Sequence, residues 1–363
     1  MTKQPLSPPD FTGVRPEHLL EAIQSCERGK GDEVLERFEQ EFAELAGTKY
    51  AVAVSSATAG LHLAMLALEI GEGDEVVCPT FTFAASAFPI TYTKAIPLFV
   101  DSEKTTWNLS PDYLEKAIKD RVAKGKKPKA IIVVHAYGMP ADLENILEIA
   151  NKYSVPLVED SANALGSTWH GKQVGSLGEL GVFSFNRNKI ISGGAGGCVV
   201  SNDERLVKKV RYFAHQAKSN APYYLHEQVG YNYGLSPILA ELIRVQLPLL
   251  PDRVNYRRSV FENYKSFFCD NANAQIELAG YKSNRWLSTF CFKESEIQQA
   301  LVQKSLNNQI EVKRLWKPMH TQPVFGTMPY FGGHESESFW QKGFCLPLDY
   351  QSFLQETYIL VKP

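Results

Sequence analysis

The chain has 363 residues, of which 44% are hydrophobic and 21% charged, and its formal net charge is -2 at neutral pH. This near balance gives no electrostatic reason to expect nucleic acid or an anionic membrane as a partner, and no apolar run reaches the ~18 residues of a membrane span. The length exceeds the ~250–300 residues at which a single core usually divides, so we expect two domains.

Short apolar runs alternate with helical patterns from residue 50 onward. The strand candidates are 50–54, 75–78, 96–100, 130–134 and 155–159, with helical segments such as 59–68 and 142–152 between them. This alternation predicts an α/β fold with a largely parallel sheet covered by helices on both faces. Ligands of such sheets gather where the strands end, which points to the loops 55–59, 79–86, 135–140 and 160–166.

The pattern changes in the last third of the chain. Residues 237–268 have helical periodicity broken at Pro248 and Pro251, and a mixed segment follows. We therefore expect a large α/β domain over 1–250 and a smaller α+β domain over 251–363. The N-terminal segment is a candidate to pack on the smaller domain.

The six cysteines are scattered along the chain without a CxxC pair. Neither a metal site nor a disulfide framework is therefore expected. The N-terminal sequence MTKQPLSPPDFTG lacks the apolar core of a signal peptide. Both observations favour the cytoplasm, where thiols stay reduced.

A lysine stands between an apolar run and a glycine-rich tail in residues 181–197, GVFSFNRNKIISGGAGG. Lys189 is an amine nucleophile able to form a Schiff base, and the glycines allow a bulky cofactor to approach the backbone. The hydroxyl of Ser184, five residues earlier, is a candidate to reach the same ligand. The alternative is that Lys189 is one more solvated surface charge.

Three other features lie where predicted strands end. Asp160 closes the run VPLVED, where a carboxylate serves as a base, a metal ligand or the partner of a protonated ring nitrogen, or only caps the next helix. Residues 55–58, SSAT, offer hydroxyls and N–H groups to a phosphate, although a simple cap has the same pattern. Phe83 is placed either to cover a planar ring or to pack in the core.

A phosphate cradle, a ring-covering aromatic, a carboxylate and an amine nucleophile are what pyridoxal phosphate requires. Over nearly its whole length the chain resembles the DegT/DnrJ/EryC/StrS sugar aminotransferases, which are fold-type I pyridoxal phosphate enzymes. The resemblance is carried by blocks in the same order: SSATAGLHLA, PTFTFAASA, HAYGMPADL, VEDSANALGS, FSFNRNK and GYNYGLS. It implies that Lys189 and Asp160 are catalytic, the first as the Schiff-base lysine and the second as the partner of the pyridine nitrogen. It also implies pyridoxamine phosphate as the second form of the cofactor.

The resemblance extends to contacts with the cofactor's phosphate, ring face and phenolic oxygen: Ala57, Thr58 and Ser184, then Phe83, then Asn163. Asn232, in GYNYG, matches an asparagine that reaches the phosphate across a dimer interface. The family pattern therefore implies a homodimer with shared active sites.

A closer resemblance is carried by SNRWLST, LWKPMHTQPVF and FWQKGFCLP. It is to the transaminases that make UDP-4-amino-4,6-dideoxy-N-acetylglucosamine in bacillosamine-type pathways. It implies L-glutamate as amino donor, a UDP-linked 4-keto-6-deoxy sugar as acceptor, and a nucleotide-sugar site that includes Asn284, Arg285, Trp286, Trp316, Lys317 and His320. Cations suit a diphosphate and aromatic rings suit a base or sugar, although the same residues serve equally as surface ion pairs and core.

The chain departs from the family pattern around the substrate. Arg187 replaces the small residue of the usual Asn-Gly-Asn-Lys, as either a contact to substrate phosphate or a solvated charge. Gly234 and Pro237 replace the usual Arg and Asn, and CERGKGDEV lacks the usual Pro-Leu-Gly. The alternatives are therefore a dTDP- or GDP-linked keto sugar, a 3-keto sugar, or a regulator without catalysis. A related dehydratase branch has histidine in place of the lysine, and Lys189 argues against it.

Overall fold

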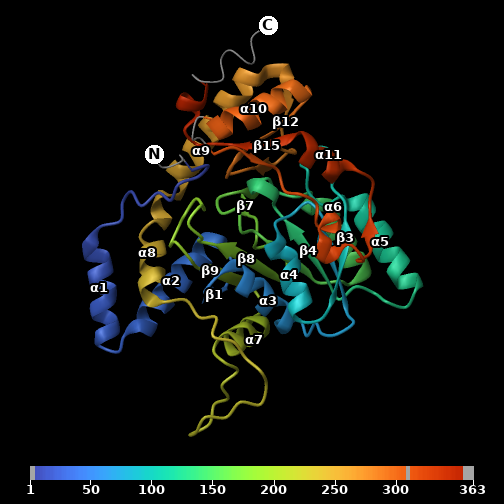
Figure 1. The fold of residues 1–363 in the computed structure, drawn as a ribbon. Helices are drawn as coiled ribbons and strands as arrows, with labels where there is room; N and C mark the ends of the chain where they lie inside the picture. The colour runs from blue at the N-terminus through green and yellow to red at the C-terminus, as the bar shows by residue number, and fades with distance from the viewer. Residues whose placement is uncertain (1–4, 308–310, 355–363) are drawn as a thin grey trace.

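A computed structural model describes residues 5–307 and 311–354 of the chain (Figure 1). At its centre lies an eight-stranded sheet, whose strands in spatial order are β1 (Tyr50–Val54), β9 (Gly197–Ser201), β8 (Leu180–Ser184), β5 (Leu157–Asp160), β4 (Ala130–Val134), β2 (Glu75–Pro79), β3 (Ile96–Val100) and β14 (Tyr330–Phe331). Within the described residues, β9 alone runs antiparallel to its neighbours in this sheet. The expected α/β sheet is thus confirmed as mostly parallel.

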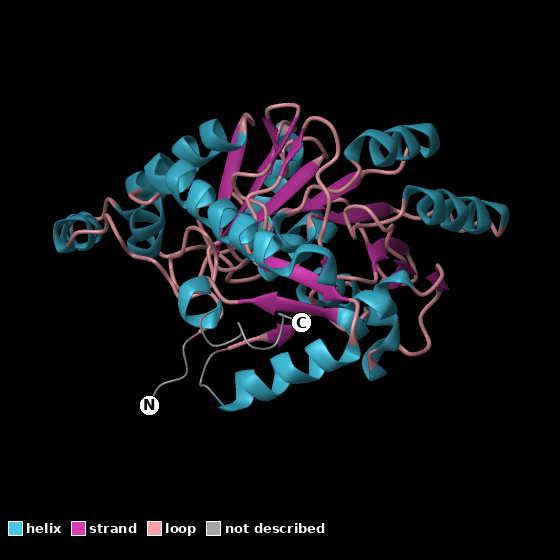
Figure 2. Cartoon of the chain, turned by 90° about the horizontal axis from the view of Figure 1, so that it is seen from above, coloured by secondary structure: helices cyan, strands magenta, loops and turns pink. Residues whose placement is uncertain are grey.

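Helices cover both faces of this sheet, as the view from above also shows (Figure 2). One face carries α3 (Ala57–Ala67), α4 (Ala84–Tyr92) and α7 (Glu204–Ala214). The opposite face carries α2 (Gly31–Ala46), α5 (Pro111–Ala123), α6 (Leu143–Tyr153) and α8 (Pro237–Arg244), and α1 (Pro16–Glu27) packs on α2 and α8. Because alternate strand residues face two covered sides, the strands are mostly apolar, with exceptions such as Glu159 and Asp160 at the end of β5.

Residues after 268 form a second, antiparallel sheet with the order β10 (Ala272–Asn273), β12 (Ser288–Phe292), β15 (Gly343–Leu346) and β13 (Lys313–Arg314). It packs with α9 (Leu250–Phe268), α10 (Ser295–Asn307) and α11 (Glu335–Lys342). A third sheet joins β11 (Tyr281–Lys282), β6 (Thr168–Trp169) and β7 (Lys172–Gln173). The division at residue 250 stays a prediction, since α9 begins there while β14 returns to the large sheet.

One expected detail differs in the structure. Pro251 does not break a helix but stands in the first turn of α9, where a missing N–H costs no hydrogen bond. Pro237, one of the departures from the family pattern, likewise begins α8. None of the helices in the described ranges is long and apolar enough to cross a membrane.

The connection from β1 to α3 positions the first part of the site. The side chain of Ser56 caps α3 by accepting a hydrogen bond from the Ala59 N–H at 3.1 Å. The end of β9 lies against this turn, because a Cβ added to Gly197 would stand 2.6 Å from the Ala57 nitrogen. Only glycine therefore lets β9 approach the start of α3 so closely.

Candidate active site

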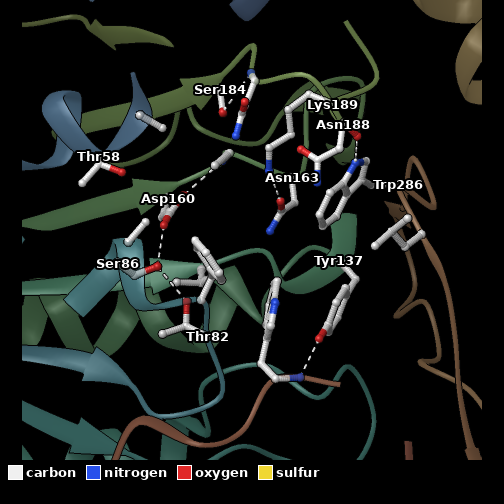
Figure 3. Close-up of a pocket in the computed structure, with 18 of the residues that line it drawn as sticks. Thr58, Thr82, Ser86, Tyr137, Asp160, Asn163, Ser184, Asn188, Lys189 and Trp286 are labelled. Atoms are coloured by element: carbon white, nitrogen blue, oxygen red, sulfur yellow. Dashed lines mark hydrogen bonds between the residues drawn. The ribbon is translucent and has the colours of Figure 1, made fainter. Parts of the chain in front are cut away.

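A cavity of about 450 Å³ lies where the parallel strands end (Figure 3). Val134, Asp160 and Ser184, the last residues of β4, β5 and β8, all line it. Seven of the residues expected to hold a cofactor line the same cavity: Ala57, Thr58, Phe83, Asp160, Asn163, Ser184 and Lys189. The size suits a small-molecule ligand, and the position is the one that parallel sheets use for ligands.

Lys189 extends into this cavity from the loop after β8. Its Nζ donates a hydrogen bond to Oδ1 of Asn163 and lies 4.2 Å from the centre of the Trp286 ring. Burial lowers the pKa of Lys189 to about 8; Asp160 opposes this change and Arg257 adds to it. A lysine with a pKa near neutrality is partly unprotonated, which a nucleophilic amine requires.

Asp160 is held by a chain of hydroxyl groups. Only 5% exposed, it accepts hydrogen bonds from Ser86 Oγ at 2.6 Å and from the Ala162 N–H at 3.1 Å. The hydroxyls of Ser86 and Thr82 are 2.7 Å apart, which extends the chain to the loop before α4. The carboxylate is thus fixed in orientation while it faces the cavity.

The first turn of α3 and the end of β8 form one side of the cavity. Figure 3 shows Thr58, Asp160 and Ser184 on the side away from Trp286, with Asn163 and Lys189 between. Unpaired N–H groups and the dipole at a helix N-terminus attract a phosphate. Phe83 precedes α4 and is 60% exposed, so its ring is free to cover a ligand.

Aromatic rings form the opposite wall. Tyr137 stacks on Trp316 with ring centres 3.9 Å apart and lies nearly parallel to Trp286 at 6.3 Å. The Tyr137 hydroxyl accepts a hydrogen bond from the backbone N–H of Trp316 at 2.9 Å. All three residues line the cavity, so two of the residues expected near a nucleotide sugar, Trp286 and Trp316, stand there.

Asn284 and Arg285 lie behind this wall and do not line the cavity. Asn284 is fully buried and its Nδ2 donates to the carbonyls of Asn163 and Leu165 at 3.0 and 2.8 Å. The Arg285 guanidinium lies 3.8 Å from the centre of the Phe261 ring, on the far side of the turn. In these positions both residues support the wall from behind. Their expected contact with substrate stays a prediction, and their placement outside the cavity lining does not favour it.

The other expected substrate residues also lie outside the cavity lining. Lys317 Nζ lies 5.5 Å from the Trp340 ring, and His320 is hydrogen-bonded to Thr80 and stacked on a tyrosine ring. Arg187 is exposed, so the structure favours its reading as a solvated charge in the single chain. Asn232, expected to act across a dimer interface, is exposed as well.

Several residues that line the cavity were not predicted from the sequence: Thr82, Ser86, Tyr137, Asn188, Lys313 and Arg314. Ser86 and Tyr137 stand in or beside loops that were expected to face ligands, but nothing in their spacing distinguished them. Lys313 and Arg314 form β13, whose two residues are too few to leave a strand pattern. Together with Lys189 they make the cavity lining cationic, since Asp160 is its only carboxylate among the described residues.

Comparisons with known proteins agree with this architecture. A model of the DegT/DnrJ/EryC1/StrS aminotransferase family matches residues 14–358. EpsN of Bacillus subtilis (strain 168), described as a candidate pyridoxal phosphate-dependent aminotransferase, is 42% identical over 94% of this chain and 90% of its own length. A GDP-perosamine synthase of Escherichia coli O157:H7 is 36% identical over 88% and 86%. A solved DegT DnrJ EryC1 StrS aminotransferase from Brucella abortus has a TM-score of 0.88 and 25% identity over 96% of both chains.

Proposed function

Since the chain belongs to the DegT/DnrJ/EryC1/StrS aminotransferase family, we propose that it is a pyridoxal phosphate-dependent aminotransferase acting on a nucleotide-linked keto sugar. The observation that carries the proposal is the placement of Lys189. A partly buried amine with a pKa lowered to about 8 faces the same cavity as a buried, oriented carboxylate. No surface lysine would combine these features.

The residues of the cavity fit pyridoxal phosphate. The helix start at Ala57 and Thr58, with the Ser184 hydroxyl, suits the phosphate, and Asp160 suits a protonated ring nitrogen. Lys189 is the amine for covalent attachment, and Asn163, hydrogen-bonded to it, suits the neighbouring ring oxygen. When bound, pyridoxal phosphate supplies an electron sink for the carbanion formed at the amino donor's α-carbon.

The chain's own residues would then perform the proton transfers. Lys189 Nζ takes a proton from the donor's α-carbon as general base and returns one as general acid. Asp160, oriented by the hydrogen bond from Ser86, would keep the ring nitrogen protonated. The wall around Tyr137 excludes water from one side of the reacting atoms.

For the acceptor we propose the C4 ketone of a UDP-linked 4-keto-6-deoxy-N-acetylhexosamine, with L-glutamate as donor. A GDP-linked 4-keto sugar is the second candidate, because several relatives of 33–36% identity are named GDP-perosamine synthase. The cationic pair Lys313 and Arg314 at the cavity supports a diphosphate in either case. The nucleobase separates the two candidates, so a panel of acceptors is the test.

We also propose a homodimer with shared active sites. The segment between α7 and α8 projects from the body of the chain (Figure 1). It exposes Tyr223, Tyr224 and Val229, large apolar side chains that are 65–82% accessible, and it also contains Asn232. A second copy of the chain would cover these groups.

All six cysteines are free, which supports a reducing compartment such as the cytoplasm.

The experiment is a two-step assay. Protein incubated with pyridoxal phosphate is reduced with borohydride and digested, and mass spectrometry is expected to find the pyridoxyl group on Lys189. Glutamate is then supplied with UDP-, dTDP- and GDP-linked 4-keto-6-deoxy sugars, and amino sugar is measured. Labelling of another lysine would refute the assignment of Lys189, and turnover of only a GDP or dTDP sugar would refute the narrower claim.

A further inference from the structure

Helix α9 places two buried arginines one turn apart behind the loop that carries Lys189. Arg253 is 8% exposed and Arg257 is 5% exposed. Nη1 of Arg253 donates to the carbonyl of Ile190, the residue after the catalytic lysine, at 3.1 Å. Both guanidinium groups therefore support the same part of the site, although neither lines the cavity of Lys189.

The two arginines differ in how their charge is compensated. Arg253 Nε lies 3.4 Å from a carboxylate oxygen of Asp10. No carboxylate in the described part of the chain forms an ion pair with Arg257, whose hydrogen bonds go to the Trp286 carbonyl at 2.5 Å and to Ser7 Oγ at 3.4 Å. A buried cation that is satisfied only by neutral oxygens is costly, so such a group calls for an explanation.

A short chain of contacts leads from this cation to the catalytic amine. Arg257 fixes the backbone of Trp286, and Trp286 Nε1 donates to the Asn188 carbonyl at 2.8 Å. Ser7 Oγ, itself in contact with Arg257, donates to the same carbonyl at 3.0 Å. The Trp286 ring then lies 4.2 Å from Lys189 Nζ. Arg257 thus touches both groups that hold the backbone next to Lys189.

We propose that Arg257 is a positioning residue for Lys189, which holds the Asn188–Lys189 backbone through Trp286 and Ser7 and places near the amine a positive charge that no direct ion pair among the described residues neutralises. The inference rests on the proposed role of Lys189. Two functions are combined in one side chain: the hydrogen bonds fix where the amine stands, and the charge favours its neutral, nucleophilic form.

The charges around the amine agree in sign with this role. Burial is the main cause that lowers the pKa of Lys189, Asp160 opposes it, and Arg257 is the one cation that adds to it. Burial and the neighbouring Arg253 lower the pKa of Arg257 itself, whereas Tyr256 and Asp10 raise it. Removal of the Arg257 charge should therefore raise the pH at which Lys189 reacts, and a rise of half a unit would lower the reactive fraction at pH 7 roughly threefold.

The test uses full-length protein without cofactor, so it does not depend on catalysis. Lys189 is methylated with formaldehyde and borohydride across a pH series, and its rate is followed by mass spectrometry; hydrogen exchange is measured on the peptide that contains Asn188 and Lys189. Arg257→Gln keeps a donor for the Trp286 carbonyl but removes the charge, so the midpoint of the methylation rate against pH should rise. Arg257→Lys keeps the charge but loses the planar guanidinium that contacts both Trp286 and Ser7. Its midpoint should therefore stay unchanged, while hydrogen exchange in the Asn188–Lys189 peptide should accelerate.

Arg253→Gln is the matched control, because it removes an equally buried guanidinium from the same helix and the same loop but one already paired with Asp10. Its midpoint should equal that of the unaltered protein. Trp286→Phe removes the indole donor together with part of the ring, and it should accelerate exchange as Arg257→Lys does, which tests the positioning role if Arg257→Gln does not fold. An unchanged midpoint in folded Arg257→Gln, or an equal rise in Arg253→Gln, would overturn the proposal. Absence of pyridoxyl-Lys189 in the borohydride experiment would instead refute the proposed function.

Discussion

Gly138 holds the loop after β4 against the turn that supports the aromatic wall. Its φ is +92°, and a Cβ added to it would stand 1.9 Å from Oδ1 of Asn284. That Oδ1 accepts a hydrogen bond from the backbone N–H of Trp286 at 2.8 Å, and Nδ2 of the same side chain donates to two backbone carbonyls. Gly138→Ala therefore tests whether this close approach maintains the site.

The expected cost of Gly138→Ala has two parts. A left-handed conformation at a residue with a Cβ costs roughly 1–2 kcal/mol. Displacement of Asn284 disrupts three hydrogen bonds, each worth about 1 kcal/mol. The free energy of unfolding should therefore fall by about 4–5 kcal/mol.

Gly125→Ala supplies the matched control for the conformational part. Gly125 has φ +71° but no heavy atom within 4 Å of an added Cβ, so it should lose only about 1–2 kcal/mol. Unfolding in urea, followed by tryptophan fluorescence, measures both variants. The double variant Gly138→Ala, Asn284→Ala removes the clashing oxygen, and its cost should be less than the sum of the two single costs by at least ~0.5 kcal/mol.

The steric reasoning fails if Gly138→Ala is no more destabilising than Gly125→Ala. It also fails if the double variant shows strict additivity, because the clash with Asn284 would then contribute nothing. Binding of pyridoxal phosphate supplies an independent measurement. It should weaken in folded Gly138→Ala and remain unchanged in Gly125→Ala.

Three further outcomes are expected. Ser86→Ala removes a hydrogen bond to the buried Asp160 carboxylate and should lower the free energy of unfolding by about 1.5–3 kcal/mol; no change in urea unfolding would contradict this. Because burial lowers the pKa of Lys189 to about 8, the rate of cofactor attachment, followed by absorbance, should rise through pH 8 and level off above it; a rise that begins only near the ordinary value of 10.5 would refute the reasoning. Burial alone would raise the pKa of Glu159, but hydrogen bonds from His135 and backbone N–H groups lower it below its ordinary 4.5. The folded state therefore binds this proton more weakly than the unfolded state, so its stabilisation is present at neutral pH and lost as the pH falls below about 4.5; Glu159→Gln should flatten urea stability against pH in that range.

The central sheet could be predicted from the sequence because its strands are covered on both faces. Five of the predicted runs became β1 to β5, with boundaries that differ by two residues or fewer, since continuous apolar segments leave a strong pattern. β9 was hidden in the glycine-rich tail, where glycines allow the close approach to α3 but weaken the strand pattern. β14 has two residues, and no periodicity can be read from so few.

Only those site residues that lie at or just after the end of a predicted strand could be placed from the sequence. Asp160, Ser184 and Lys189 lie in order along one region, so their convergence follows from the sheet. Arg285, in contrast, has φ +50° and its guanidinium lies on the Phe261 ring outside the cavity lining, while Trp286 lines the cavity. Which of two neighbouring residues faces the cavity depends on the local backbone conformation, and residue type alone does not determine it.

The wall of the cavity also has a consequence for the order in which the protein assembles. Leu6 lines the cavity, its N–H donates to the Glu311 carboxylate at 2.8 Å, and its carbonyl accepts the Leu348 N–H at 3.1 Å. These partners are separated from Leu6 by 305 residues or more of chain. A ribosome that has finished the first seven strands of the eight-stranded sheet, through Ser201 at the end of β9, has therefore not yet supplied the pieces that close the pocket. Tight retention of the cofactor should begin only after Leu348 has left the exit tunnel, so nascent chains that stop before this residue should lose it readily.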